Sequence, residues 1–193
     1  MIITLLIALG LLILDQAVKL TIMATMAEGE SITVIKDFFY INYVKNNGVA
    51  FGFEFTSNPT ANLIIQLVIA FGVLTAFIII LLKVKDFKKN KWFMISMALL
   101  IGGLLGNVID RIFYSTHSVT DFLSFIIYYP WFVGGKLTMC SFPFAVFNLA
   151  DTWLTVGVIM MIIYLIFIEP KKEKERAKTE SSENTEDEVI DLK

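Results

Sequence analysis

Four stretches of the chain are apolar over a length that can cross a lipid bilayer. They cover approximately residues 2–23, 61–82, 92–113 and 143–168. A transmembrane helix needs about 20 mostly apolar residues, and a backbone inside lipid must satisfy its own hydrogen bonds, as a helix does. The pattern therefore predicts an all-α membrane protein whose four transmembrane helices form one domain over residues 1–168.

The first span is expected to be a retained anchor rather than a cleaved secretory leader. A cleavable leader starts with basic residues and has an uninterrupted apolar centre. The stretch 2–23 has no basic residue ahead of its apolar part and carries Asp15 and Lys19 within it. We therefore count it among the four helices.

Basic residues between and after the spans predict the orientation. Residues 83–91 contain five lysines, and residues 171–176 contain four basic side chains. Basic loops stay in the cytoplasm, so both termini of this multi-pass membrane protein are expected on the cytoplasmic side. The segments 24–60 and 114–142 then face the outside.

Both outer segments have patterns of their own. Three runs rich in β-branched and aromatic residues, at 31–36, 38–45 and 49–55, predict a small extracytoplasmic β-sheet, with a hairpin turn at Asn46-Asn47-Gly48. The second segment contains an aromatic run at 122–132 that is too short to span. Trp and Tyr favour the membrane interface, so 114–142 is expected to be an interfacial loop or helix.

Composition agrees with this picture and narrows the chemistry. Of 193 residues 56% are hydrophobic and 18% charged, with a mean hydropathy of +0.72, which excludes a soluble globular protein. Cys140 and His117 are the only residues of their types, so no disulfide, metal site or cofactor is expected. Carboxylates remain as carriers of any chemistry.

Charge is distributed unevenly along the chain. Nine of the 18 acidic residues fall in 169–193, which is polar and Ser/Thr-rich and is predicted to be a disordered cytoplasmic tail. No basic patch interleaved with aromatic residues occurs, so nucleic-acid binding has no support.

Three acids lie inside the spans, where each carries an insertion cost of about 2.5–3.5 kcal/mol and so needs a reason. They are Asp15, Asp110 and Asp151, all placed by the orientation in the outer half of the membrane, with Asp121 beside them in the outer loop. Three polar residues share a helix face with one of these acids by their spacing of three or four: Lys19, Asn107 and Asn148. Arg111 can extend to the outer interface, and the glycines Gly102, Gly103 and Gly106 allow another helix to approach closely.

Three interpretations of this cluster remain open from spacing alone. The polar residues could serve only helix packing, they could form the ion path of a small transporter or channel subunit, or two carboxylates could share a proton as an acid–base pair. The last arrangement would support aspartic-type peptide hydrolysis. Asp121 and Asp151 suit such a pair, because one hangs over the outer surface and the other rises from just below it.

The chain closely resembles lipoprotein signal peptidase, also called signal peptidase II, a family of bacterial membrane aspartic proteases. Five blocks carry the resemblance in order along the chain: Asp15-Gln16-Ala17-Val18-Lys19, Asn46-Asn47-Gly48-Val49-Ala50-Phe51-Gly52, residues 102–111 (GGLLGNVIDR), Val119-Thr120-Asp121-Phe122 and Phe147-Asn148-Leu149-Ala150-Asp151. Together they reach from the first span to the fourth.

The resemblance implies a role for each matching residue. Asp121 and Asp151 would be the catalytic pair, Asp110 would support the site with Asn107 and Arg111, and other residues would line or brace it, namely Asp15, Lys19, Asn46, Gly103 and Asn148. The implied substrate is a prolipoprotein whose Cys carries a diacylglyceryl group, cleaved on the N-terminal side of that Cys. We expect a monomer that contacts membrane lipid.

The chain departs from the family pattern in the second outer segment. Ten residues separate Asp110 from Asp121, about two more than usual, and His117 in this stretch is expected to be an exposed loop residue. Residues 128–139 look like an insertion.

Overall fold

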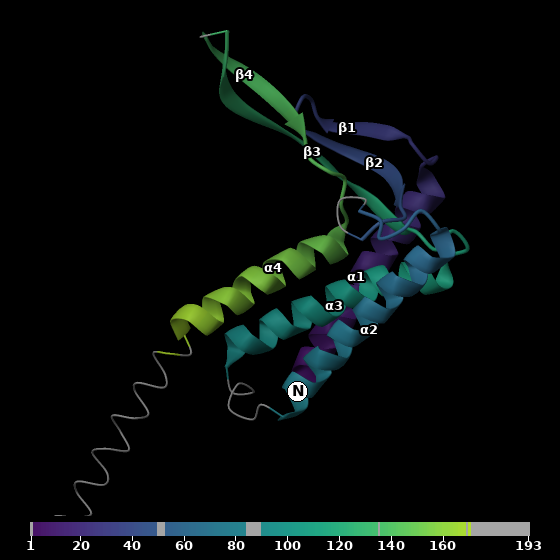
Figure 1. The fold of residues 1–193 in the computed structure, drawn as a ribbon, viewed down its shortest axis with the longest axis vertical. Coiled ribbons are helices and arrows are strands. Elements are labelled where there is room, and N and C mark those ends of the chain that lie inside the picture. The colour runs from purple at the N-terminus through teal and green to yellow at the C-terminus, as the bar shows by residue number, and fades with distance from the viewer. Residues whose placement is uncertain (1, 50–52, 84–89, 135, 169, 171–193) are drawn as a thin grey trace, which may run out of the picture.

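A computed structural model describes residues 2–49, 53–83, 90–134, 136–168 and 170. It contains a bundle of long helices with an antiparallel sheet across one end (Figure 1). The lysine-rich residues 84–89 and the tail 171–193 lie outside the described residues, so the orientation and the disorder inferred from them stay predictions.

Four helices are long and apolar enough to cross a membrane. They are α1 (Ile2–Thr25), α2 (Pro59–Lys83), α3 (Lys91–Phe113) and α4 (Leu149–Ile163), which continues as a π-helical turn over Tyr164–Ile168. At 1.5 Å per residue the 24 residues of α1 reach about 36 Å, enough for a hydrocarbon core of about 30 Å. The sequence prediction of four spans is therefore confirmed by length and composition.

Helix α3 is the most buried of the four and packs against the other three. Glycines on α3 allow the neighbouring backbones to come close, because a Cβ on Gly102 would lie 3.0 Å from the carbonyl oxygen of Ala8 on α1. The apolar core of the bundle includes Met97 and Ile101 on α3 and Tyr164, whose ring lies 5.7 Å from that of Phe93.

The start of α4 differs from the predicted span 143–168. The apolar residues ahead of it are not helical: strand β4 ends at Pro143, and the backbone of Phe147 forms a bridge with Leu123. Asn148 caps the helix, which begins at Leu149. Asp151 therefore lies in the first turn of α4 and not two turns inside it.

The sheet has four antiparallel strands in the order β1-β2-β3-β4. They are β1 (Ser31–Ile35), β2 (Phe39–Asn46), β3 (Val119–Val133) and β4 (Lys136–Pro143). The sheet rests on the end of α1, where Tyr43 and Phe122 pack against Ile22 and Met26. This packing determines which residues of β2 and β3 face the ends of the helices.

Two expectations for the outer segments were wrong. Residues 49 and 53–55, the described part of the third predicted strand, form no strand, and β2 pairs instead with β3, whose partner residues lie 73 to 86 positions further along. The segment 114–142, expected to be a loop or helix, instead contains the long strand β3 and its partner β4, while its placement at the membrane interface stays a prediction. The protein is thus mostly helical but not all-α.

Candidate active site

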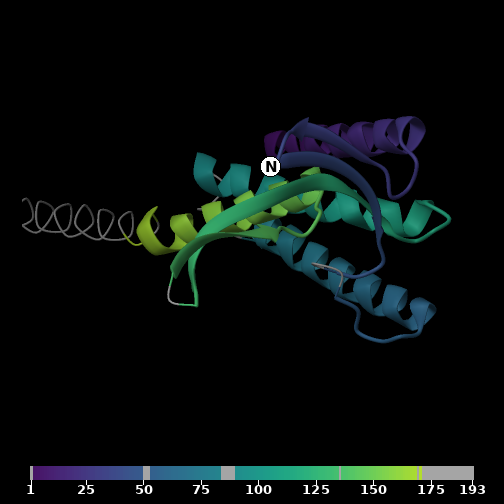
Figure 2. The same ribbon diagram turned by 90° about the horizontal axis from the view of Figure 1, so that it is seen from above.

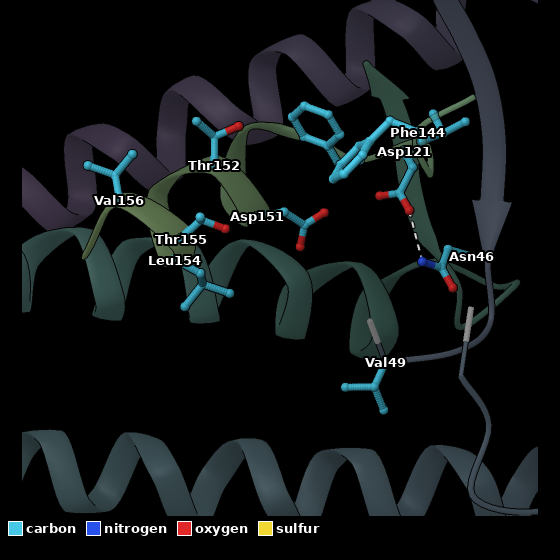
Figure 3. Close-up of a pocket in the computed structure, with 11 residues that line it drawn as sticks. Asn46, Val49, Asp121, Phe144, Asp151, Thr152, Leu154, Thr155 and Val156 are labelled. Carbon is cyan, nitrogen blue, oxygen red and sulfur yellow. Dashed lines mark hydrogen bonds between the residues drawn. The ribbon is translucent and has the colours of Figure 1, made fainter. Parts of the chain in front are cut away.

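Asp121 and Asp151 both line one pocket at the sheet end of the bundle, and their carboxylates face one another in Figure 3. Asp121 is the third residue of β3, and Asp151 stands in the first turn of α4. The pocket has a volume of about 510 Å³. Apart from the two acids its walls are mainly apolar and come from the β4–α4 connection and from α4: Phe144, Val146, Phe147, Leu154 and Val156.

Asp121 is almost completely buried, with 1% of its surface exposed. Its Oδ2 accepts a hydrogen bond from Asn46 Nδ2 at 2.9 Å, and its Oδ1 accepts one from Asn148 Nδ2 at 2.7 Å. The strand register explains the first contact: Val44 lies opposite Asp121, so Asn46 is its diagonal neighbour on the same face.

The surroundings of Asp121 favour a protonated carboxyl. Burial, followed by the negative charge of Asp151, raises the pKa of Asp121 from 3.8 to about 7. The hydrogen bonds from Asn46 and Asn148 and the charge of Lys19 act in the opposite direction and do not cancel the effect. Asp121 can therefore carry a proton near neutral pH.

Asp151 accepts hydrogen bonds from the backbone of the residue that caps α4 and from a side chain of α3. Its Oδ2 accepts the backbone N–H of Asn148 at 3.1 Å, while the Asn148 side chain accepts the N–H of Asp151 at 2.9 Å, which makes a reciprocal capping box. Its Oδ1 accepts a hydrogen bond from Asn107 Nδ2 at 2.8 Å. The positive end of the helix dipole adds to these donors.

Two amide side chains connect the acids to the helices. Asn148 Nδ2 donates to Asn107 Oδ1 at 3.1 Å as well as to Asp121. The same oxygen of Asn107 accepts a hydrogen bond from Lys19 Nζ at 3.2 Å. A continuous chain of hydrogen bonds therefore runs from α1 through α3 to both carboxylates.

Lys19 is fully buried within the bundle, where it forms ion pairs with two carboxylates. Its Nζ lies 2.8 Å from Asp15 Oδ2 and 3.0 Å from Asp110 Oδ2. A buried charge is tolerated when it is paired and its remaining donors are satisfied. The other oxygen of Asp15 accepts the N–H of Ala150 at 2.9 Å. This charge cluster thus ties α1 to the first turn of α4.

Asp110, on α3, connects this helix to α1 and to strand β3 at the edge of the site. Its Oδ1 accepts a hydrogen bond from Gln16 Nε2 at 2.8 Å, and its Oδ2 accepts the backbone N–H of Thr120 at 3.0 Å. Because Thr120 directly precedes Asp121, the bond from its N–H fixes the position of this part of β3 relative to α3. Asp110 is not among the residues that line the pocket.

Two glycines of α3 make room for α4 and for Asp15. A Cβ on Gly103 would lie 2.5 Å from the carbonyl oxygen of Ala150, and one on Gly106 would lie 2.6 Å from Asp15 Oδ2. Real Cβ atoms do not approach other atoms so closely. Any side chain at either position would push the first turn of α4, and Asp151 with it, away from α3.

Arg111 secures the loop that follows β2. Its Nη2 donates to the carbonyl oxygen of Gly48 at 2.7 Å, its Nη1 to that of Asn107 at 3.0 Å, and its Nε to Gln66 Oε1 at 2.5 Å. Gln66 Nε2 in turn donates to the carbonyl oxygen of Asn47 at 2.8 Å, and so does Asn62 Nδ2 at 3.1 Å. This network holds the backbone next to Asn46.

Some of these contacts come from residues that the sequence analysis did not single out. Gln16, Asn62 and Gln66 are polar residues inside apolar spans, and the spacing of Asn62 and Gln66 by four places them on one face of α2. This spacing is visible in the sequence and could have indicated that the two side chains bind a common partner. His117, by contrast, is exposed as expected, in a left-handed turn (φ 52°) with Nδ1 2.8 Å from the Arg111 carbonyl oxygen.

The fold and the site define a polytopic membrane protein that brings two carboxylates, unequal in surroundings, to the end of an apolar pocket. No group of three or more His, Cys, Asp or Glu side chains suited to a metal ion occurs among the described residues.

Comparisons with known proteins identify the family. A family model described as Signal peptidase (SPase) II matches residues 7–167. A lipoprotein signal peptidase of Staphylococcus carnosus is 38% identical over 165 residues, which cover 86% of this chain and 91% of the relative. One from Pelodictyon phaeoclathratiforme is 36% identical over 161 residues, or 82% and 86%. The chain therefore belongs to the signal peptidase II family and is a membrane protease.

Solved structures agree with this assignment. Two structures described as bacterial membrane enzymes superpose with TM-scores of 0.67 and 0.66 at 32% and 33% sequence identity. They cover 84% and 86% of this chain, and 87% and 93% of their own.

Proposed function

We propose that this protein is an aspartic endopeptidase that removes the signal peptide from diacylglyceryl-modified prolipoproteins by cutting on the N-terminal side of the lipidated Cys. The observation that carries the proposal is the pair formed by Asp121 and Asp151, which face one apolar pocket with Asp121 biased toward its protonated form. A pair that shares one proton is what general acid–base hydrolysis of an amide requires.

The surroundings of the two acids divide their roles. Asp151 acts as the base: it takes a proton from water as the water oxygen attacks the scissile carbonyl carbon. Asp121 acts as the acid, because its proton goes to the carbonyl oxygen as the tetrahedral intermediate forms. When the C–N bond breaks, the leaving nitrogen takes the proton from Asp151, and a hydroxyl proton of the intermediate returns to Asp121. The pair ends in its starting state.

Neighbouring amides position the acids for this cycle. Asn46 and Asn148 both donate to Asp121, and Asn107 and the backbone of Asn148 both donate to Asp151. The carboxylates are thereby oriented before a substrate arrives, which lowers the reorganisation needed at the transition state. The cluster of Lys19, Asp15 and Asp110 holds the helices that carry these amides.

The cavities on the two sides of Asp121 suit a lipidated peptide. The apolar pocket of about 510 Å³ extends along α4 and would take the apolar groups of the substrate. A second cavity of about 330 Å³ shares Asn46 and Asp121 with it but is bordered by Lys45 and Glu54. We assign this polar cavity to the chain that follows the scissile bond.

The proposal also places the protein in its membrane. Four spans put both termini on one side, and the positive-inside rule makes that side cytoplasmic. The sheet and the carboxylate pair, at the far end of the bundle from the start of α1, then face the outside of a bacterial cytoplasmic membrane. Every side chain of the site comes from one chain, so a monomer suffices.

An ion path is not favoured by the distribution of buried charge. The buried charged side chains of the described residues, Asp15, Lys19, Asp110, Arg111 and Asp121, all lie in the half of the bundle nearer the sheet. A transport path would continue to the opposite end.

The test is cleavage of purified precursor by purified protein in detergent or lipid. We expect cleavage of a diacylglyceryl-modified precursor and none of the unmodified one, with the product beginning at the lipidated Cys. Asp121→Asn and Asp151→Asn should each abolish turnover while the protein stays folded and membrane-inserted. Full turnover by either variant would contradict the catalytic pair, and equal cleavage of both precursors would contradict the substrate.

A further inference from the structure

The outer half of the β3–β4 ribbon is exposed and apolar on both faces. Strands β3 and β4 pair from Ile126 with Pro143 to Val133 with Lys136, and no described strand covers either side of this part. Opposite residues share a face, so Phe132 and Leu137 lie on one face and Trp131 on the other. Their exposed fractions are 69%, 65% and 62%.

Water is a poor surrounding for such a ribbon. An isolated two-stranded hairpin is at best marginally stable in water. A ribbon with one polar face could at least turn that face toward the water. Here both faces carry large apolar side chains, including Tyr128, Tyr129 and Met139 at 48%, 41% and 64% exposure. A contiguous apolar surface of this kind marks a site of interaction.

The charges of the ribbon indicate what it contacts. Residues 122–150 contain no Asp or Glu, and their single charge is Lys136, next to the turn between the strands. Trp and Tyr side chains concentrate at the level of lipid headgroups, and a lysine is attracted to the phosphates there. The combination matches a lipid–water interface.

The place of the ribbon in the fold brings it to lipid. It leaves the sheet end of the bundle on the side of α4, as both views show (Figures 1 and 2). Five residues after β4 join it to α4, a membrane-spanning helix with exposed apolar side chains such as Val158 and Ile162. The ribbon therefore lies on the side of the bundle where α4 exposes its apolar surface.

We infer that the outer half of the β3–β4 ribbon is embedded in the interface of the bilayer at the sheet end of the bundle, with Trp131 and Phe132 among the upper acyl chains and Lys136 at the phosphates. The ribbon is then a lipid-binding element in addition to the four spans. It also sets the depth of the pocket, because Phe144 and Phe147, which follow β4, line it.

The experiment uses Trp131 as its own fluorescent probe. The chain has three tryptophans, and Trp92→Phe with Trp153→Phe leaves Trp131 alone. Both changes should be tolerated, because Trp92 is exposed on α3 and the buried Nε1 of Trp153 has no hydrogen-bond partner among the described residues. The full-length variant is reconstituted in phosphatidylcholine–phosphatidylglycerol vesicles that contain lipid brominated either near the headgroup or near the chain end.

We expect lipid brominated near the headgroup to quench Trp131 about twice as strongly as lipid brominated near the chain end, with protection from aqueous acrylamide, as for an interfacial side chain. Phe132→Asp with Leu137→Asp should abolish the lipid quenching and admit acrylamide, whereas Met139→Leu should change neither. Acrylamide access without lipid quenching would overturn the inference, and so would protection from both quenchers, which would mean that protein covers the ribbon. None of these readouts depends on peptidase activity, so failure of the proposed function would leave the result unaffected.

Discussion

Asp121 and Asp151 are bound by one common residue, Asn148, through different groups. The side-chain Nδ2 of Asn148 donates to Asp121, and its backbone N–H donates to Asp151. The residue that caps α4 therefore also spaces the two acids. This double role makes the contributions of helix capping and of carboxylate positioning separable by substitution.

Asn148→Ser is predicted to separate these roles. A serine caps a helix about as well as asparagine, but its hydroxyl is too short to reach both Asp121 and Asn107. We expect kcat on a lipidated precursor to fall about tenfold to a hundredfold, as when a group that orients a reactive ligand is removed, with the melting temperature almost unchanged. Asn148→Ala should lower both, since losing a cap costs about 1 kcal/mol. A serine variant with unchanged kcat would show that the contact to Asp121 is dispensable.

The pH dependence of activity should report the pKa of Asp121. The proposed mechanism needs Asp121 protonated, so kcat/KM is predicted to fall as pH rises through about 7. Asn46 donates a hydrogen bond that lowers this pKa. Asn46→Ala should therefore move the falling limb to higher pH, whereas Thr75→Val, a change on the exposed side of α2, should leave it in place. A limb that stays fixed in the Asn46 variant would argue against Asp121 as the acid.

Stability should depend on pH through the same group. The pKa of Asp121 is raised in the folded protein, so its proton is bound more tightly there, and stability is lost as pH rises from about 4 to about 7. Asp121→Asn removes this penalty. The variant should melt at a higher temperature than the parent at about pH 8 and differ little at about pH 4. The opposite order at alkaline pH would mean that the charged carboxylate stabilises the fold.

Gly106→Ala should destabilise the protein by about 1–3 kcal/mol, the usual cost of overpacking. The added Cβ would lie 2.6 Å from Asp15 Oδ2 and 2.9 Å from Ala150 Cβ. Gly72→Ala on α2 is the matched control, because a Cβ there meets no atom within 4 Å. Thermal unfolding in detergent measures both. Equal melting temperatures for the two variants would show that α3 and α4 can separate without loss.

Gln66→Leu should weaken activity although Gln66 does not line the pocket. The change leaves Arg111 Nε and the Asn47 carbonyl oxygen without this partner, which loosens the loop beside Asn46. We expect kcat to fall about tenfold with KM changed less, as for an interaction that acts in the transition state. Thr75→Val on the same helix again provides the control. A rise in KM with kcat intact would instead place Gln66 in substrate binding.

The sequence predicted the helices where length and hydropathy suffice. The described spans α1, α2 and α3 begin and end within two residues of the predicted limits. The start of α4 was placed six residues early because Pro143 to Phe147 are as apolar as the helix, although they end a strand and form a bridge. Asn148, followed three residues later by Asp151, is a capping signature that marks the true start.

The sheet shows what a local pattern cannot provide. β2 was found from its own residues, but its pairing with β3 joins positions 73 to 86 apart, and only the register brings Asn46 next to Asp121. The choice of Asp121 and Asp151 over Asp110 came from family resemblance. Spacing could not show that Asp110 already accepts hydrogen bonds from Gln16 and Thr120.

The capping box of α4 bears on inhibition of this enzyme. Asp151 starts a membrane helix through its bond to the Asn148 backbone and is also proposed to activate water. A compound that binds this carboxylate would act at a position where a resistance substitution removes the bond to the Asn148 backbone together with the proposed base. Escape from such a compound would have to arise elsewhere, in the apolar walls of the pocket.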